Sequence, residues 1–141
     1  MIDGFFGEYR WLSNFHLAEV TYEGVKYPSV ENAYQASKWP KESRTPFTKC
    51  SASDAKKYGK TMRPAPWWID ARIGIMEDLV LQKFTQHPDL QNLLLATDGQ
   101  EIVEGNYWGD QFWGVCKGEG ENNLGKIIMR VRQYVSRTTK N

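Results

Sequence analysis

The sequence predicts an α+β fold: a single compact, mostly helical domain with a small antiparallel sheet or hairpin. Three features lead to this prediction. With 141 residues, the chain has the usual size for one hydrophobic core. Apolar residues recur at helical spacing after Pro66, and two short β-like segments flank the turn-forming pair Glu23-Gly24. We expect residues 1–135 to form the domain and residues 136–141 to be a polar tail that frays.

The first elements are a hairpin and a helix. Residues 18–22 and 25–27 form the two strands, because they flank the turn-forming pair. Ser29 has the side chain of a helix N-cap and opens a helix over residues 29–39. Trp39-Pro40 ends this helix, since proline disfavours helical geometry in the residue before it.

Two further helices follow. After a polar loop or short turn of helix over residues 41–48, Ser51 caps a short helix that Gly59 stops. Pro66 then starts a long amphipathic helix, which His87-Pro88 breaks. Its apolar residues at helical spacing are Trp68, Ile69, Ile73, Met76, Leu79, Val80 and Phe84.

The C-terminal part of the chain joins short elements to one last helix. We expect a helix over residues 89–97, a strand over residues 101–104, and a loop or short strands up to Gly120. Asn122 or Asn123 then caps the last helix. The apolar residues of that helix are Leu124, Ile127, Ile128, Val131 and Val135.

Charge and cysteine content narrow the class of protein. The formal net charge is +1, so no global excess of positive charge demands nucleic acid, while a local basic groove stays open. Cys50 and Cys116 are the only cysteines, and the first residues do not read as a secretory segment. We therefore expect reduced thiols and a cytoplasmic setting. No apolar run approaches the roughly 20 residues that span a bilayer, so we expect no membrane partner.

The sequence lacks the motifs that metal-dependent and phosphoryl-transfer enzymes use. His16 and His87 are the only histidines, and neither has another ligand at metal-binding spacing. The sequence contains no P-loop, dinucleotide fingerprint or nucleophile elbow. We therefore expect no metal and no cofactor.

The stretch Ser29–Trp39 carries the most informative candidate chemistry. On a helix, Glu31, Gln35 and Lys38 fall on one stripe, because residues four and seven apart return to nearly the same face. A carboxylate there can activate water or stabilise the positive charge on a ribose as its base departs. A desolvated lysine is nucleophilic and can form a Schiff base with an opened sugar. The alternative is an ordinary solvated helix face.

A second candidate segment, Glu104–Gly114, places carboxylates among aromatic residues and glycines. Asp110 lies between Trp108 and Trp113, whose rings can stack on a base with a gain of roughly 1–3 kcal/mol. The alternative for Asp110 is a turn aspartate. The candidates for a phosphate or ribose contact are Ser13, Asn14, Arg63 and Arg72. Turn, cap or surface roles are the alternatives for these four.

The order of short motifs along the chain resembles the NADAR domain family, also described as YbiA-like. The similarity runs from about Phe5 to Arg132. Its pieces are Phe5-Phe6, Leu12–Phe15, Ser29–Lys38, Lys83-Phe84, Leu94–Thr97, Ile102–Glu104, Asp110–Gly114, Asn123–Gly125 and Met129–Arg132. Each piece is short, but the ordered set is specific.

The resemblance implies a compact, largely helical α+β fold and N-glycosidase activity. Members of the family hydrolyse the bond between ribose-phosphate and an amine in riboflavin-pathway intermediates, or remove ADP-ribose from guanine bases of nucleic acid. It implies that Glu31 leads the catalysis, that Lys38 faces the substrate and that Asp110 helps orient it. The residues that it places around the substrate are Ser13, Asn14, Trp68, Glu104, Trp108, Trp113, Gly114 and Asn123.

Two other functions stay open from the residues. One is a non-catalytic module that binds ADP-ribose or a nucleotide, and the other is a nucleic-acid-binding or interaction module built on the aromatic residues. The enzymatic hypothesis requires Glu31 to point into a cleft that is walled by indole rings and shared with Asp110. The oligomeric state is not readable from the sequence.

Overall fold

The computed structural model describes residues 1–139, and the chain forms two compact units within it. The middle unit is Asn14–Lys83, and the terminal unit combines Met1–Ser13 with Phe84–Asn141. The predicted single domain over residues 1–135 includes both units and stays a prediction. None of the helices among the described residues has the length and apolar character that crossing a bilayer requires.

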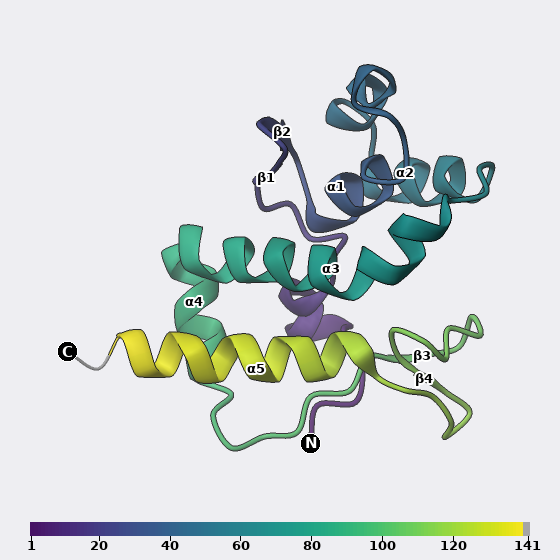
Figure 1. Cartoon of the computed structure of the whole chain (residues 1–141). Coiled ribbons are helices and arrows are strands. Elements are labelled where there is room, and N and C mark those ends of the chain that lie inside the picture. Colours follow the sequence, from purple (N-terminus) through teal and green to yellow (C-terminus); the bar gives the residue numbers. More distant parts are fainter. Residues whose placement is uncertain (140–141) are drawn as a thin grey trace. The chain divides into compact units, whose positions relative to one another are not determined.

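The middle unit begins with the predicted hairpin (Figure 1). Strands β1 (Val20–Tyr22) and β2 (Val25–Tyr27) pair antiparallel, with Val20 opposite Tyr27. Glu23 and Gly24 have positive φ values of 46° and 84°, the backbone of a tight two-residue hairpin turn. The hairpin prediction is confirmed, although the first strand starts at Val20 rather than at residue 18.

Helix α1 (Val30–Ala36) follows the hairpin and is capped as predicted. The Ser29 hydroxyl accepts a 3.1 Å hydrogen bond from the Asn32 N–H. The predicted end at residue 39 is wrong, because α1 ends at Ala36. Beyond that point the Lys38 N–H bonds to the Gln35 carbonyl three residues back, which is the tighter 3₁₀ pattern.

The polar stretch after α1 contains two short 3₁₀ helices, η2 (Lys41–Ser43) and η3 (Thr45–Thr48), in agreement with a loop or short turn of helix. Helix α2 (Ala52–Gly59) then ends at the predicted glycine. Its N-cap is Ser51, whose hydroxyl accepts a 3.0 Å hydrogen bond from the Asp54 N–H.

The long helix α3 (Pro66–Gln86) has the predicted bounds. Met76, Leu79 and Val80 are buried, as its apolar pattern predicted. Ile69 and Ile73 are not, since they are 46% and 39% exposed. The apolar face therefore does not extend over the whole first half of the helix.

The terminal unit contains η1 (Gly7–Leu12), α4 (Pro88–Leu95) and α5 (Asn123–Thr138). Strands β3 (Gly105–Asn106) and β4 (Val115–Cys116) form a short parallel pair. The largest side chains of its core include Ile2, Leu12, Leu94, Ile102, Ile127 and Ile128. The predicted strand over residues 101–104 is wrong, because pairing there is limited to an isolated parallel bridge between Ile2 and Ile102.

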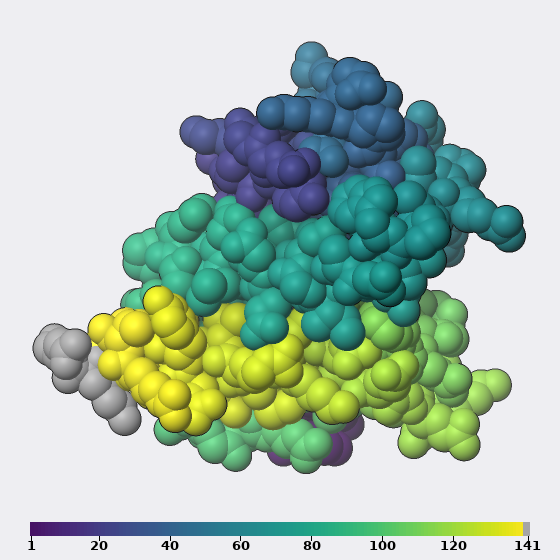
Figure 2. Space-filling view, in the orientation of Figure 1, coloured from purple at the N-terminus to yellow at the C-terminus, as the bar shows by residue number. Residues whose placement is uncertain are grey.

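Helix α5 starts without the predicted side-chain cap. Asn122 occupies the N-cap position with a φ of 53°, and no side chain caps the helix there. Instead, the Asn122 amide accepts from the Glu104 N–H at 2.9 Å and donates to the Ile102 carbonyl at 3.0 Å. On the face that Figure 2 shows, the light green loop before α5 adjoins the yellow helix.

The predicted polar tail begins later than expected. Ser136–Thr138 still belongs to α5, so the tail over residues 136–141 is wrong at its start. Residues 140 and 141 lie outside the described residues. The α+β, mostly helical fold with one small antiparallel hairpin is confirmed.

Candidate active site

Glu31 lies in the first turn of α1, on a helix whose residues are all buried. Glu31 is only 7% exposed. Its backbone N–H donates to the Asn14 carbonyl at 3.1 Å, and its Oε1 accepts a 2.8 Å hydrogen bond from Gln35 Nε2. The solvated helix face is therefore excluded for Glu31 and Gln35. A buried carboxylate that is hydrogen-bonded to a neutral amide remains a candidate catalytic residue.

Gly59 of α2 gives the Gln35 side chain its position. A methyl group on Gly59 would overlap Gln35 Oε1, so only glycine allows this approach. Gln35 Oε1 is buried and has no hydrogen-bond partner among the residues that the structure describes. Its amide nitrogen is thus directed to Glu31 while its oxygen packs against the α2 backbone.

Lys38 reaches the same two helices although it lies beyond the end of α1. Its Nζ donates a long, 3.5 Å hydrogen bond to the Gly59 carbonyl and lies 5.2 Å from the ring centroid of Trp68. Burial lowers the pKa of the Lys38 amine; the charge of Glu31 opposes this shift and the charge of Arg72 adds to it. The amine is therefore more readily deprotonated than an exposed lysine, which favours a nucleophile.

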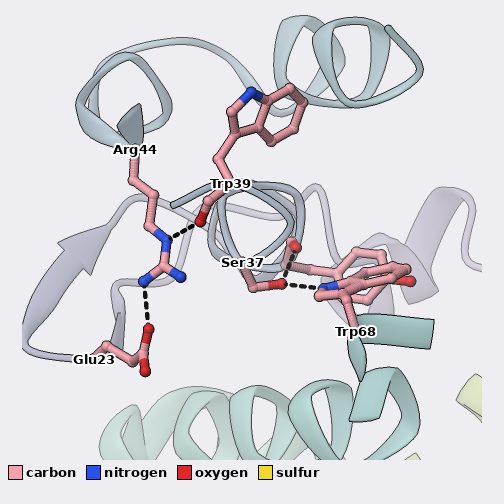
Figure 3. A network of polar contacts seen from close by, with 6 residues as sticks. Glu23, Ser37, Trp39, Arg44 and Trp68 are labelled. Atoms are coloured by element: carbon pink, nitrogen blue, oxygen red, sulfur yellow. Dashed lines mark hydrogen bonds and ion pairs between the residues drawn. The ribbon is translucent and has the colours of Figure 1, made fainter. Parts of the chain in front are cut away.

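Trp68 is a buried wall beside this lysine (Figure 3). It is 3% exposed, and its Nε1 donates a 2.8 Å hydrogen bond to the Ser37 hydroxyl. That hydroxyl in turn donates to the Tyr34 carbonyl at 2.5 Å. The Tyr34 and Trp68 rings lie 5.2 Å apart and tilted by 50°. The indole that the resemblance places around the substrate is thus fixed by its bond to Ser37, at the end of α1.

Arg44 holds the segment after α1, as the same figure shows. Its Nε donates to the Trp39 carbonyl at 2.8 Å, and its Nη1 pairs with Glu23 Oε1 at 2.5 Å. The Arg44 guanidinium also lies 5.0 Å from the Tyr22 ring centroid. Sequence reasoning missed this residue, because a single arginine in a polar stretch gives no sign that it is buried.

The other candidates of the middle unit differ in their exposure. Asn14 is 9% exposed, and its Nδ2 donates to Met76 Sδ at 3.4 Å. Arg72 is half-buried and acts electrostatically on Lys38. Arg63 is exposed. Its predicted phosphate contact is supported only by its positive charge at the surface and stays a prediction.

In the terminal unit, Asp110 organises its own loop. Its Oδ1 accepts hydrogen bonds from the N–H groups of Phe112 at 3.1 Å and Trp113 at 2.9 Å. Its N–H donates to Asn106 Oδ1 at 3.0 Å, and its carbonyl accepts from Asn106 Nδ2 at 2.8 Å. These are the bonds of a turn aspartate. Its predicted role in orienting the substrate stays a prediction.

Glu104 and Gly114 meet beside this loop. Asn106 Nδ2 donates to Glu104 Oε2 at 2.9 Å, and a methyl group on Gly114 would overlap the Glu104 side chain. Ser13, at the end of the first segment of the terminal unit, is half-buried. Asn123 donates from Nδ2 to the Phe112 carbonyl at 3.0 Å, so it anchors the loop to the start of α5.

The two predicted indole walls of this unit, Trp108 and Trp113, differ in their exposure. Trp108 is 44% exposed and contacts Phe6 edge to face, with ring centroids 6.3 Å apart. Trp113 is half-buried and contacts Phe112 edge to face at 4.8 Å. Trp108 therefore has the more accessible ring for stacking.

The predicted site residues thus divide between the two units. The middle unit holds Asn14, Glu31, Gln35, Lys38, Arg63, Trp68 and Arg72, and the terminal unit holds Ser13, Glu104, Trp108, Asp110, Trp113, Gly114 and Asn123. That Glu31 shares a cleft with Asp110 stays a prediction. Across residues 1–139, no group of three or more His, Cys, Asp or Glu side chains is placed to hold a metal ion.

Comparison with known proteins gives a consistent family. The family model described as the NADAR domain matches residues 5–136 of the chain. An N-glycosidase of Nostoc punctiforme is 32% identical over 135 residues, which are 90% of this chain and 86% of that protein. The NMR structure of the Escherichia coli protein YbiA matches with a TM-score of 0.85 at 27% identity, covering 100% of this chain and 90% of that chain.

A longer relative also contains a similar segment. A riboflavin biosynthesis protein of Vibrio vulnificus is 36% identical over 129 residues, which are 87% of this chain. The chain spans 35% of the length of that protein. The similarity therefore covers one part of a larger polypeptide in that relative.

Proposed function

This chain belongs to the NADAR domain family, and from that premise we propose that it is an N-glycosidase that hydrolyses a ribose–nitrogen bond. The observation that carries the proposal is the buried Glu31 carboxylate, held by Gln35 at 2.8 Å, with the amine of Lys38 close enough for the Glu31 charge to affect its pKa. A carboxylate, an amine and an indole wall on one side of α1 suit the chemistry of a departing base.

The hydrolysis balances with the residues at hand. As the C1′–N bond breaks, its electron pair leaves with the nitrogen, which takes up a proton from solvent; the attacking water later returns one proton, so the overall reaction consumes one water molecule. Positive charge develops on the ribose, and the negative charge of Glu31 stabilises it. Water adds to C1′ and gives up one proton, which Glu31 can accept as a general base.

Lys38 offers a covalent variant of the same reaction. Its lowered pKa leaves more of the neutral amine at a given pH. The C1′–O4′ bond first opens, the proton of the substrate nitrogen moves to O4′, and C1′ becomes doubly bonded to that nitrogen. The Lys38 amine then adds to C1′, and the original nitrogen leaves as an amine with the proton of the lysine nitrogen, so that a Schiff base remains. Water then adds to the imine carbon, releases the sugar and regenerates the amine, so the overall products are unchanged.

We propose two substrate classes, ADP-ribosylated guanine in nucleic acid or a nucleoside, and the ribose-phosphate amines of the riboflavin pathway. The names of the relatives, an N-glycosidase and a riboflavin biosynthesis protein, support the reaction class and the second substrate. Arg72 is our candidate for the phosphate, because a half-buried guanidinium can bind it bidentately. Both cysteines are free thiols, which supports a reducing, cytoplasmic setting.

The decisive experiment is a paired substrate assay. The purified chain is incubated with ADP-ribosylated guanosine and, separately, with a riboflavin-pathway ribose-phosphate intermediate, and released base or amine is measured. We expect turnover of one of them, and a loss of about 10²-fold or more in kcat for Glu31→Gln.

Glu42→Gln is the matched control for that variant. Glu42 is an exposed glutamate of η2 in the same unit, so its substitution removes one carboxylate without touching α1. Equal kcat for Glu31→Gln and Glu42→Gln would remove Glu31 from the mechanism. Tight binding of ADP-ribose without turnover of either substrate would favour the non-catalytic binding module instead.

A further inference from the structure

A cavity lies in the middle unit, between η3 and α2. Its volume is about 550 Å³, which falls within the usual range of small-molecule sites, roughly 300–1,000 Å³. Phe47, Cys50, Asp54, Lys57 and Tyr58 line it. None of the residues lining this cavity belongs to the candidate active site. It therefore has the size of a ligand site and no part in the proposed hydrolysis.

The cavity has a flat aromatic wall that is supported from behind. The Tyr58 ring stacks on Trp39 with centroids 5.2 Å apart and planes 15° apart. Phe47 is buried and lies 5.4 Å from the Tyr58 ring. Tyr58 itself is 50% exposed. A ring that is fixed by two neighbours and still accessible is a ready surface for another planar group.

The framework of the cavity is shared with the candidate active site. Asn32 follows Glu31 on α1, and its Nδ2 donates to the carbonyls of Phe47 at 2.9 Å and Cys50 at 2.8 Å. Gly59 follows Tyr58 on α2, and its carbonyl accepts the bond from Lys38. The same two helices therefore carry both sites on successive residues.

The segment around the cavity concentrates positive charge. Residues 41–63 contain seven Lys and Arg and two Asp and Glu, in a chain whose total formal charge is only +1. Arg44 is paired with Glu23 inside the unit. Lys49, Lys57 and Lys60, in contrast, are exposed. This local excess fits a ligand with more than one phosphate.

We propose that this cavity binds an unstacked base of a nucleic acid strand, next in sequence to the nucleotide on which the enzyme acts. The base stacks on Tyr58, Asp54 accepts a hydrogen bond from its amino group, and exposed lysines contact the flanking phosphates. That the bound base lies next to the nucleotide on which the enzyme acts rests on the proposed function. Binding of the base itself does not. A free ribose-phosphate metabolite would leave both the cavity and the basic segment unused.

The test measures binding of an unmodified strand and reads no turnover. A single-stranded DNA hexamer is titrated into the ¹⁵N-labelled full chain, and chemical shifts and fluorescence anisotropy are followed at low and moderate salt. We expect the largest shift changes within residues 46–61 and a binding affinity that falls as salt rises. Tyr58→Ala should weaken binding roughly five- to a hundredfold, the usual effect of losing one stacking ring.

Two variants make the comparison specific. Tyr58→Phe keeps the ring and should bind the hexamer like the wild type. Tyr134→Ala removes a tyrosine of similar exposure, 52% against 50%, from α5 of the terminal unit, and should also leave binding unchanged. Melting curves of all variants identify any loss of folding. If Tyr58→Ala does not fold, the proposal is judged by whether the chemical shift changes of the wild type fall within residues 46–61.

Several results would overturn the proposal. They are no binding of the hexamer by the wild type, equal affinity for Tyr58→Ala and Tyr134→Ala, or shift changes that avoid residues 46–61. Equal affinity for a mononucleotide and the hexamer would also overturn it, since no strand is then recognised. Failure of the glycosidase assay leaves a positive binding result standing, and failure to bind leaves a positive turnover result standing.

Discussion

Gln35 donates its side-chain N–H to Glu31 across one turn of α1, at 2.8 Å, and it does so because Gly59 leaves room for its oxygen. The Glu31 carboxylate settles the orientation of the amide, because it accepts only from the N–H side, and the oxygen then faces the α2 backbone at Gly59. The hydrogen bond from Gln35 thus fixes the position of one oxygen of the Glu31 carboxylate. This preorganisation depends on a residue without a side chain on another helix.

We predict that Gly59→Ala disturbs catalysis more than folding. The added methyl group must displace Gln35 Oε1, which breaks the hydrogen bond to Glu31. We expect kcat to fall about tenfold or more, corresponding to about 1.4 kcal/mol of lost transition-state stabilisation. Released base and denaturant unfolding measure the two effects.

Gly74→Ala is the control for this prediction. Gly74 lies within α3 of the same unit, and nothing lies near the position of an added methyl group. That variant should keep its activity and gain about 0.5–1 kcal/mol of stability from better helix propensity. The same kcat in both glycine variants would contradict the proposed function of the Gln35–Glu31 contact.

The parts of the fold that local chemistry decides were predictable from the sequence. Ser29 and Ser51 cap their helices through bonds to residues three positions later, and such bonds need no tertiary contact. The Glu23-Gly24 turn and the bounds of α3 likewise follow from nearby residues. The pairing of Glu31 with Gln35 belongs to the same class, because residues four apart are neighbours on any helix.

Features that depend on contacts between residues far apart in the sequence were not predictable. Whether a charged stripe is solvated depends on what packs over it, and α1 is buried throughout. Asn122 reads as a helix cap, yet its amide is used by the backbone around Ile102, twenty positions away. The burial of Arg44, which pairs with Glu23 of the hairpin turn, also depends on a contact beyond the local sequence. Residue types alone do not encode these partners.

Substitution of Asp110 can separate its turn function from its predicted catalytic function. Asp110→Ala removes the acceptor of two backbone N–H groups, from Phe112 and Trp113, and should cost about 1–2 kcal/mol of stability. Asp110→Asn keeps a carbonyl oxygen at the same place, so it should retain stability while it lowers kcat. Wild-type kcat in the asparagine variant would assign Asp110 to the loop alone.

We predict that Lys38 is the site of a covalent adduct. Borohydride added during turnover should reduce the imine and leave a stable sugar adduct on the chain, visible by mass spectrometry. Lys38→Ala should show none. Lys26→Ala, which removes an exposed lysine of β2, should trap the adduct like the wild type. An adduct that survives in Lys38→Ala, or is absent from the wild type during active turnover, would rule out the covalent route.

The charges around Lys38 should shift its pKa in opposite directions. Burial has the largest effect and lowers the pKa of the Lys38 amine. The charge of Glu31 raises this pKa, and the charge of Arg72 lowers it further. Glu31→Gln should therefore lower this pKa further, whereas Arg72→Gln should raise it. NMR titration of the Lys38 amine in the two variants measures the shifts without requiring turnover. Shifts of the same sign would contradict the arrangement of the three side chains.

Lys83 should make stability depend on pH in the alkaline range. It is 1% exposed, and burial lowers its pKa to about 7 from 10.5. Between these values the unfolded chain binds the proton and the folded chain does not, so the free energy of unfolding rises with pH. The contribution is at most about 1.4 kcal/mol per pH unit.

Denaturant unfolding at pH 7, 8.5 and 10 measures this dependence. Lys83→Met removes the titrating group from the core of α3, so its free energy of unfolding should rise less over the range than that of the wild type. Lys126→Met, at an exposed position of α5, should keep the wild-type slope. Parallel slopes for Lys83→Met and the wild type would show that Lys83 stays protonated in the folded chain, stabilised by charge partners strong enough to offset its burial.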